Sequence, residues 1–173
     1  MSTQTTTGQA AVLTGSDWTA FAHIPSPDGG LIKSERRRGD TNMPGHLFRE
    51  TIWYKKDVRP HDHPWSFTSL IIRGWIEETI FSRLPDGTLV ISEVRRHYAG
   101  TNYSCPHGTI HMITDCDPGS ITLMSIDPLV SGPMDWSSYA FDGTVARPLT
   151  PEEKKADTDL FLRRYAALNK PIV

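Results

Sequence analysis

Four of the seven histidines form two groups whose spacing suits metal chemistry. His61 and His63 make a His-x-His pair, and His107 and His111 lie together further along the chain. In a β-strand, alternate residues point to the same face, so His61 and His63 can direct both imidazoles at one point. Imidazole nitrogen is a common ligand of transition metals. By itself the pair is compatible with a metal site, but it is more typical of surface histidines at the start of a strand; Asp62, on the opposite face, is a poor candidate ligand.

The sequence around these histidines predicts short β-strands, which must position the imidazoles. Glycine and proline number 13 each, so the chain turns often, and apolar β-branched and aromatic runs lie between the turns. This pattern predicts an antiparallel, all-β sandwich or barrel. We expect strands within Leu47–Lys56, Ser66–Leu84 with a break near Gly74, Thr88–Tyr98, Thr109–Asp115 and Ser120–Ile126.

The C-terminal part of the sequence has a different character. Thr150 can cap a helix, Pro151 suits the first helical position, and Glu153 completes a capping box. Apolar side chains then recur near helical spacing, which predicts a helix over residues 151–168. We expect three parts: a disordered tail over 1–15, the barrel with an N-terminal extension over 16–149, and a helical segment over 150–173 packed outside the barrel.

Composition excludes several classes of protein. The 173 residues suit one domain, and 18 Lys and Arg against 20 Asp and Glu give a net charge of −2, which argues against a nucleic-acid-binding protein. No apolar run is long enough for a membrane helix, and the N-terminus lacks the features of a signal peptide. Only Cys105 and Cys116 are present, so no disulfide framework is expected and we predict a cytoplasmic protein.

Two longer patterns surround the histidines. His61 and His63 are followed after three residues by Phe67, and Gly74 comes six residues later. The second pattern has a glycine, five residues, Pro-x-Gly, two residues, a histidine, three residues and an acidic residue. Its members are Gly100, Pro106, Gly108, His111 and Asp115.

These two patterns resemble the two motifs of the cupin superfamily over roughly residues 59–115. The resemblance implies a double-stranded β-helix barrel of the jelly-roll type, with a divalent metal held by His61, His63 and His111. The superfamily often has a glutamate ligand where this chain has Phe67, and an asparagine where it has Asp115. Some thiol dioxygenases of the superfamily also lack that glutamate and hold iron with three histidines. By that analogy Fe(II) is the expected metal, and Zn, Ni or Mn would suit the same ligands.

Other side chains are candidates for the rest of the site. Glu77, Glu78 or Asp115 can supply a replacement carboxylate, and His107 with Tyr103 is the best available acid–base pair. Each also has an ordinary structural interpretation as a packing or surface residue. The residues expected to line a substrate pocket are Arg49, Trp53, Trp65, Phe67, Arg73 and Trp136.

The favoured hypothesis is a non-haem Fe(II) oxygenase or dioxygenase acting on a small polar metabolite together with dioxygen. A non-catalytic small-molecule-binding or regulatory cupin is the alternative, and a cupin isomerase or epimerase is the third. Neither the substrate nor a need for 2-oxoglutarate follows from the sequence. The segment Ser66–Arg73 carries apolar residues on both faces, so we also expect a second subunit to cover part of the barrel in a homodimer.

Overall fold

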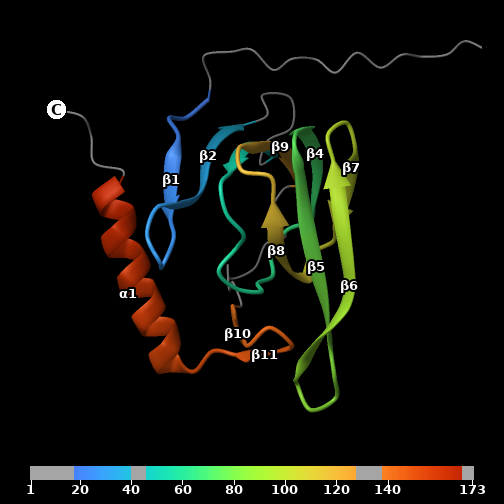
Figure 1. Ribbon diagram of the computed structural model, residues 1–173, viewed down its shortest axis with the longest axis vertical. Helices are drawn as coiled ribbons and strands as arrows, with labels where there is room; N and C mark the ends of the chain where they lie inside the picture. Colours follow the sequence, from blue (N-terminus) through green and yellow to red (C-terminus); the bar gives the residue numbers. More distant parts are fainter. Residues whose placement is uncertain (1–17, 40–45, 128–137, 169–173) are drawn as a thin grey trace, which may run out of the picture.

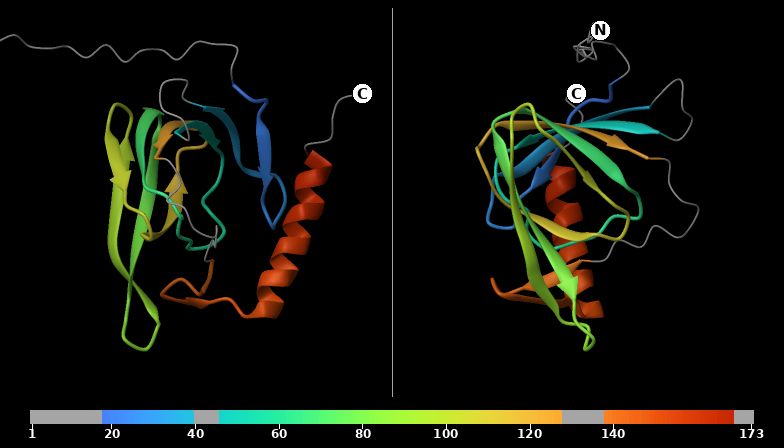
Figure 2. Two further views of the ribbon diagram at one scale, coloured as in Figure 1. Left: turned by 180° about the vertical axis from the view of Figure 1, so that it is seen from behind. Right: turned by 90° about the vertical axis from the view of Figure 1, so that its right-hand side faces the viewer.

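The structure is a computed structural model that describes residues 18–39, 46–127 and 138–168. Within these ranges, eleven strands form two antiparallel sheets that curl around a shared interior (Figures 1 and 2). The six-stranded sheet runs in the order β1 (Ala22–Pro25), β2 (Leu31–Gly39), β3 (Leu47–Trp53), β9 (Ser120–Ile126), β4 (Phe67–Arg73) and β7 (Asn102–Cys105). The five-stranded sheet runs β10 (Tyr139–Phe141), β11 (Val145–Pro148), β6 (Leu89–Tyr98), β5 (Trp75–Arg83) and β8 (Ile110–Cys116). The predicted all-β fold is confirmed.

Side-chain alternation places the core between the two sheets. On β4, Phe67, Ser69 and Ile71 are buried on one face, while Thr68 and Ile72 on the other face are exposed. Strand β8 differs, because its first four residues are all buried. Met112 packs under Tyr139 and Ala146 of β10 and β11 in a separate apolar cluster. A strand covered on both faces loses the alternating pattern, so β8 is the most enclosed strand that carries a histidine.

The two sheets are joined between β4 and β5 at Gly74. Its backbone has φ of +73°, and a Cβ atom there would lie 2.2 Å from the Ser120 hydroxyl oxygen. That hydroxyl accepts a hydrogen bond from the Trp75 amide at 3.0 Å. Any larger residue would displace Ser120 and adopt an unfavourable backbone conformation, so the chain requires glycine where it crosses from one sheet to the other.

The helix α1 spans Pro151–Leu168, the predicted range. The Glu153 amide donates to the Thr150 hydroxyl at 3.3 Å, and the Glu153 carboxylate accepts from the Thr150 amide at 2.9 Å, which is the expected capping box. The helix runs beside β1 (Figure 1), and Arg59 donates to Asp157 at 2.9 Å. The predicted tail over 1–15 lies outside the described residues. Among those described, no helix is both long and apolar enough to cross a membrane.

Candidate metal centre

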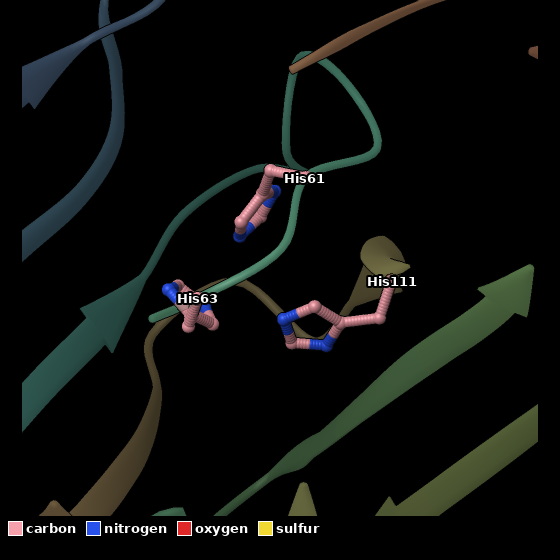
Figure 3. Close-up of side chains that lie close together, drawn as sticks. All are labelled: His61, His63 and His111. Atoms are coloured by element: carbon pink, nitrogen blue, oxygen red, sulfur yellow. The ribbon is translucent and has the colours of Figure 1, made fainter. Parts of the chain in front are cut away.

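Three histidines converge inside the barrel, as Figure 3 shows. One ligand nitrogen from each of His61, His63 and His111 lies within 4.8 Å of the other two. The ring centroids are 4.9 Å apart for His61 and His63, and 5.0 and 5.2 Å from His111. These separations match three imidazoles that share one metal ion, because each metal–nitrogen bond is about 2.0–2.1 Å long.

The His-x-His segment does not lie on a regular strand, so that part of the prediction is wrong. His61 forms an isolated bridge, and its amide and carbonyl each make a 2.9 Å hydrogen bond with the backbone of His111. His63 lies beyond this bridge, outside any strand. Pro60 and Pro64 flank the segment, and proline has no N–H to continue a ladder. The backbone bridge, rather than strand alternation, brings His61 to His111.

A buried carboxylate holds the His111 ring. Glu78 on β5 is 1% exposed, and its Oε1 lies 2.6 Å from His111 Nδ1. Since a carboxylate accepts, Nδ1 donates, and the lone pair of the ring is therefore on Nε2. His111 Nε2 is buried and has no hydrogen-bond partner among the described residues. A buried nitrogen lone pair that faces two other imidazoles fits a metal ligand.

His97 and Tyr103 extend this arrangement behind Glu78. The second carboxylate oxygen of Glu78 lies 3.2 Å from His97 Nε2, and Tyr103 stacks on the His97 ring with centroids 3.9 Å apart. Burial alone would raise the pKa of Glu78, but hydrogen bonds to His111 and His97 outweigh it and lower the pKa to about 2. Glu78 is therefore ionised and is best described as the group that orients His111.

The other two rings are held by different contacts. The His61 Nδ1 lies 3.1 Å from the Arg59 carbonyl oxygen, to which it donates. The His63 ring stacks on Trp65 at a centroid distance of 5.2 Å. Burial lowers the pKa of His61 to about 4, against the opposing charge of Asp57, and burial lowers the pKa of His63 far below its usual range. Both rings are neutral at physiological pH, which is the form that binds metal.

Comparison with known proteins agrees with this architecture. No protein-family model and no curated protein sequence matches the chain. Among solved structures, an RmlC-like cupin from Shewanella frigidimarina is 17% identical and the match covers 64% of this chain and 86% of that one, with a TM-score of 0.44. KdgF from Halomonas sp. is 19% identical over 58% of this chain and 82% of that one, with a TM-score of 0.44. Pumpkin seed globulin reaches a TM-score of 0.50 at 11% identity, over 71% of this chain and 35% of the globulin. The chain has a cupin fold.

Phe67 forms an apolar wall beside the three histidines. Phe67 is 1% exposed and belongs to a cluster with Trp65 and Cys105. Its ring lies 5.6 Å from the His63 ring and 5.9 Å from the His111 ring. Among the described residues, the ligand group around His61 and His63 contains no carboxylate. A metal bound there would keep more positions for substrate than in a four-ligand site.

Arg49 on β3 lies in the same interior. Its side chain is 6% exposed, and its positive charge contributes to lowering the pKa of His63. One terminal nitrogen donates to the Met124 sulfur at 2.9 Å, a weak acceptor, and another lies 3.8 Å from a Glu35 oxygen. The Arg49 Nε is buried with no hydrogen-bond partner among the described residues. A buried guanidinium with spare donors can bind an anion.

Several predicted substrate residues lie elsewhere. Trp53 is buried in an apolar cluster, and its Nε1 donates to Thr122 at 3.2 Å, so it contributes to packing. Arg73 is exposed and donates to the Gly119 carbonyl oxygen at 2.7 Å, because the β4–β9 register shifts between Ile71 and Arg73. It does not reach the histidines. Trp136 lies outside the described residues.

The predicted acid–base pair is not brought together. His107 is exposed in the turn between β7 and β8, where its amide donates to the Ser66 hydroxyl at 3.0 Å. Tyr103 faces the interior and packs on His97 instead. Tyr103 lies on β7 and His107 lies in the turn that follows it. Closeness in sequence does not make a strand residue and a turn residue point in the same direction. This separation removes the support for the isomerase hypothesis.

Only one of the three candidate carboxylates faces the interior. A β-bulge lies between Glu77 and Glu78 in the pairing of β5 with β8, so that Glu77 pairs with Asp115 and Glu78 with Ile113. The bulge reverses the alternation along β8, and Asp115 is exposed although it follows His111 by an even number of residues. His97, whose ring contacts Glu78, was not among the residues predicted for the site. The sequence feature that could have identified His97 is the β5–β6 hairpin. Its register pairs His97 with Ile76, which lies on the same face of β5 as Glu78.

Proposed function

We propose that this cupin binds a divalent transition metal through His61, His63 and His111 and acts as a non-haem Fe(II) dioxygenase on a small anionic substrate. The observation that carries the proposal is the set of three convergent imidazoles, with a buried His111 Nε2 that has no hydrogen-bond partner among the described residues. Iron in such a site supplies the one-electron chemistry that dioxygen needs to react with an organic molecule.

The residues around the histidines support an anionic substrate. Imidazole ligands carry no negative charge, so they leave the charge of a divalent ion uncompensated, and Arg49 adds a buried positive charge near His63. A carboxylate or another small anion would balance the charge of both the metal ion and Arg49. The Arg49 N–H that has no partner would donate a hydrogen bond to the anion and orient it. Trp65 and Phe67 would exclude water from the reacting atoms, which strengthens electrostatic interactions in the site.

Metal analysis of protein purified without a metal-affinity tag tests the proposal. We expect near-stoichiometric iron and oxygen uptake with a suitable small acid. The matched variant His107→Ala, altered at an exposed histidine, should keep its iron, whereas His63→Ala should lose it. Stoichiometric zinc or nickel without turnover would favour the non-catalytic binding function, and wild-type iron content in His63→Ala would refute the site.

A homodimer is part of the proposal. Ile72 on the outer face of β4 is 50% exposed, and Leu70 lies on the same face. A second subunit that covers this face would remove apolar surface from water. Sedimentation that shows only a monomer of 19.4 kDa at high concentration would refute it.

A further inference from the structure

A second group of ligand side chains lies on the other side of the His111 ring. One ligand atom from each of Glu78, Cys105 and His111 lies within 4.8 Å of the other two. These residues are 1%, 4% and 4% exposed, respectively. Glu78 contacts Nδ1, the ring nitrogen adjacent to the side-chain attachment, whereas Nε2 faces His61 and His63 (Figure 3). The two groups therefore share His111 through opposite edges of its ring.

A cavity of about 240 Å³ adjoins this second group. Glu78 and Cys105 line it, together with the hydroxyl-bearing residues Ser104 and Thr109. Glu93 and Arg95 of β6 also line the cavity, and both are partly exposed side chains that pair with each other at 2.5 Å. The cavity thus has access to solvent on the β6 side, with room for an ion and its water molecules.

The chemistry of these donors suits a thiophilic ion. A thiolate, an imidazole and a carboxylate with one water molecule make a four-coordinate set of the kind that zinc accepts. Without a cation, burial and the nearby Glu78 raise the pKa of Cys105 to about 12, so the thiol is protonated. Coordination to a divalent ion deprotonates a thiol outright, because the ion supplies the charge that the buried site lacks.

We propose that Cys105 Sγ, the Glu78 carboxylate and His111 Nδ1 form a second metal site for a thiophilic divalent ion of the zinc class, served by the cavity between β5, β6 and β7. Binding releases one proton to solvent, from the Cys105 thiol, while the ring proton of His111 moves from Nδ1 to Nε2. Neither histidine of the His-x-His pair takes part.

The two sites compete for metal because both use the His111 ring and each requires a different tautomer of it. The neutral ring carries one proton, which is on Nδ1 when Nε2 binds metal and must be on Nε2 when Nδ1 binds metal. Occupation of both nitrogens would require loss of the last ring proton, which is costly near neutral pH. Weakening the three-histidine set should therefore shift metal toward Cys105.

Titration of the metal-free protein with Co²⁺ tests the proposal, because cobalt bound to a thiolate gives a strong near-ultraviolet charge-transfer band. We expect a band in His63→Ala that is at least about threefold stronger than in wild type at equal cobalt, since the competing site is weakened. The band should be lost in His63→Ala/Cys105→Ser. The matched control is His63→Ala/Cys116→Ser, which should keep it because Cys116 belongs to a different core cluster.

The outcomes separate this proposal from the proposed function. A band in both wild type and His63→Ala, with no histidine-only cobalt signal, would support the second site and count against the three-histidine centre. Absence of the band in His63→Ala, or its persistence after Cys105→Ser, would overturn the second site. Circular dichroism confirms folding, and Glu78→Gln in the His63→Ala background provides a second variant, in which the apparent cobalt affinity should fall at least about tenfold.

Discussion

His111 and the pair His61–His63 reach the same point by different structural means. His111 lies on β8, which pairs with β5 and is buried on both faces, and a carboxylate 2.6 Å from Nδ1 orients its ring. His61 and His63 lie on a segment whose only ladder contacts among the described residues are two isolated bridges at His61. A carbonyl oxygen and an aromatic stack hold the two rings. One half of the centre is therefore built into the sheet, and the other depends on local contacts.

The difference has consequences for stability and for metal binding. The contacts that hold His111 also stabilise the pairing of β8 with β5. Changes to His111 or Glu78 should therefore lower the free energy of unfolding as well as the metal affinity. Contacts on the 60–66 segment are mostly local, so changes there should affect the metal with little effect on the sheets. Four experiments test this contrast.

Loss of a histidine should have the largest effect. His61→Ala, His63→Ala and His111→Ala should each lose most of the metal bound at the three-histidine centre, measured as iron, while the barrel stays folded. His111→Ala should in addition destabilise the metal-free protein by about 1–3 kcal/mol, because it leaves buried Glu78 without its shorter hydrogen bond. Metal content and urea unfolding of the three variants measure both effects. Equal unfolding free energies for His61→Ala and His111→Ala would contradict the contrast.

A carboxylate in place of Phe67 would lie between His63 and His111 and could bind the same metal ion as both. Phe67→Glu would bury an unpaired charge between His63 and His111, and should destabilise the metal-free protein by several kcal/mol. Metal should restore much of this loss, because the carboxylate becomes a fourth ligand. Turnover should fall by at least about tenfold, since that ligand takes a position needed by substrate or dioxygen.

Thermal melting with and without metal checks this prediction, with Phe67→Leu as the apolar control. The metal-induced rise in Tm should be larger in Phe67→Glu than in wild type or Phe67→Leu. A variant that melts low and gains nothing from metal would show that Phe67 serves only in packing.

The metal-free protein should lose stability in mild acid. The pKa of His61 is lowered from 6.5 to about 4 in the folded state, so the unfolded chain binds a proton that the folded chain does not. Its contribution is therefore constant above pH 6.5 and falls between pH 6.5 and about 4. The expected slope is about 1.4 kcal/mol per pH unit for each such histidine. Urea unfolding across this range measures the slope, which should be shallower in His61→Ala.

The carboxylate behind His111 should have the smallest of these effects. Glu78→Gln keeps the size of the side chain but weakens the acceptor for Nδ1–H, and metal affinity should fall about 10–100-fold. Glu77→Gln is the matched control, because Glu77 is the neighbouring residue and pairs with Arg96 at 2.8 Å, away from the histidines. Competition with a chelator measures both affinities. A similar loss in the two variants would exclude a specific orienting role for Glu78.

The sequence by itself determined the β-rich architecture, the helix over 151–168 and the choice of His61, His63 and His111. These depend on periodicity, capping and spacing, which are local properties of the chain. Phe67 follows His63 at a fixed interval and begins β4, so its place beside the histidines also depends on spacing.

The tertiary structure alone decided which polar groups accompany the histidines. The β-bulge opposite Glu77 and Glu78 turned Asp115 outward, and the crossing between sheets brought Glu78, His97 and Cys105 behind His111. A register shift of one residue exchanges the two faces of a strand, and long-range pairing, not local sequence, sets that register. The three histidines that converge could therefore be predicted from spacing, while the residues that orient them could not.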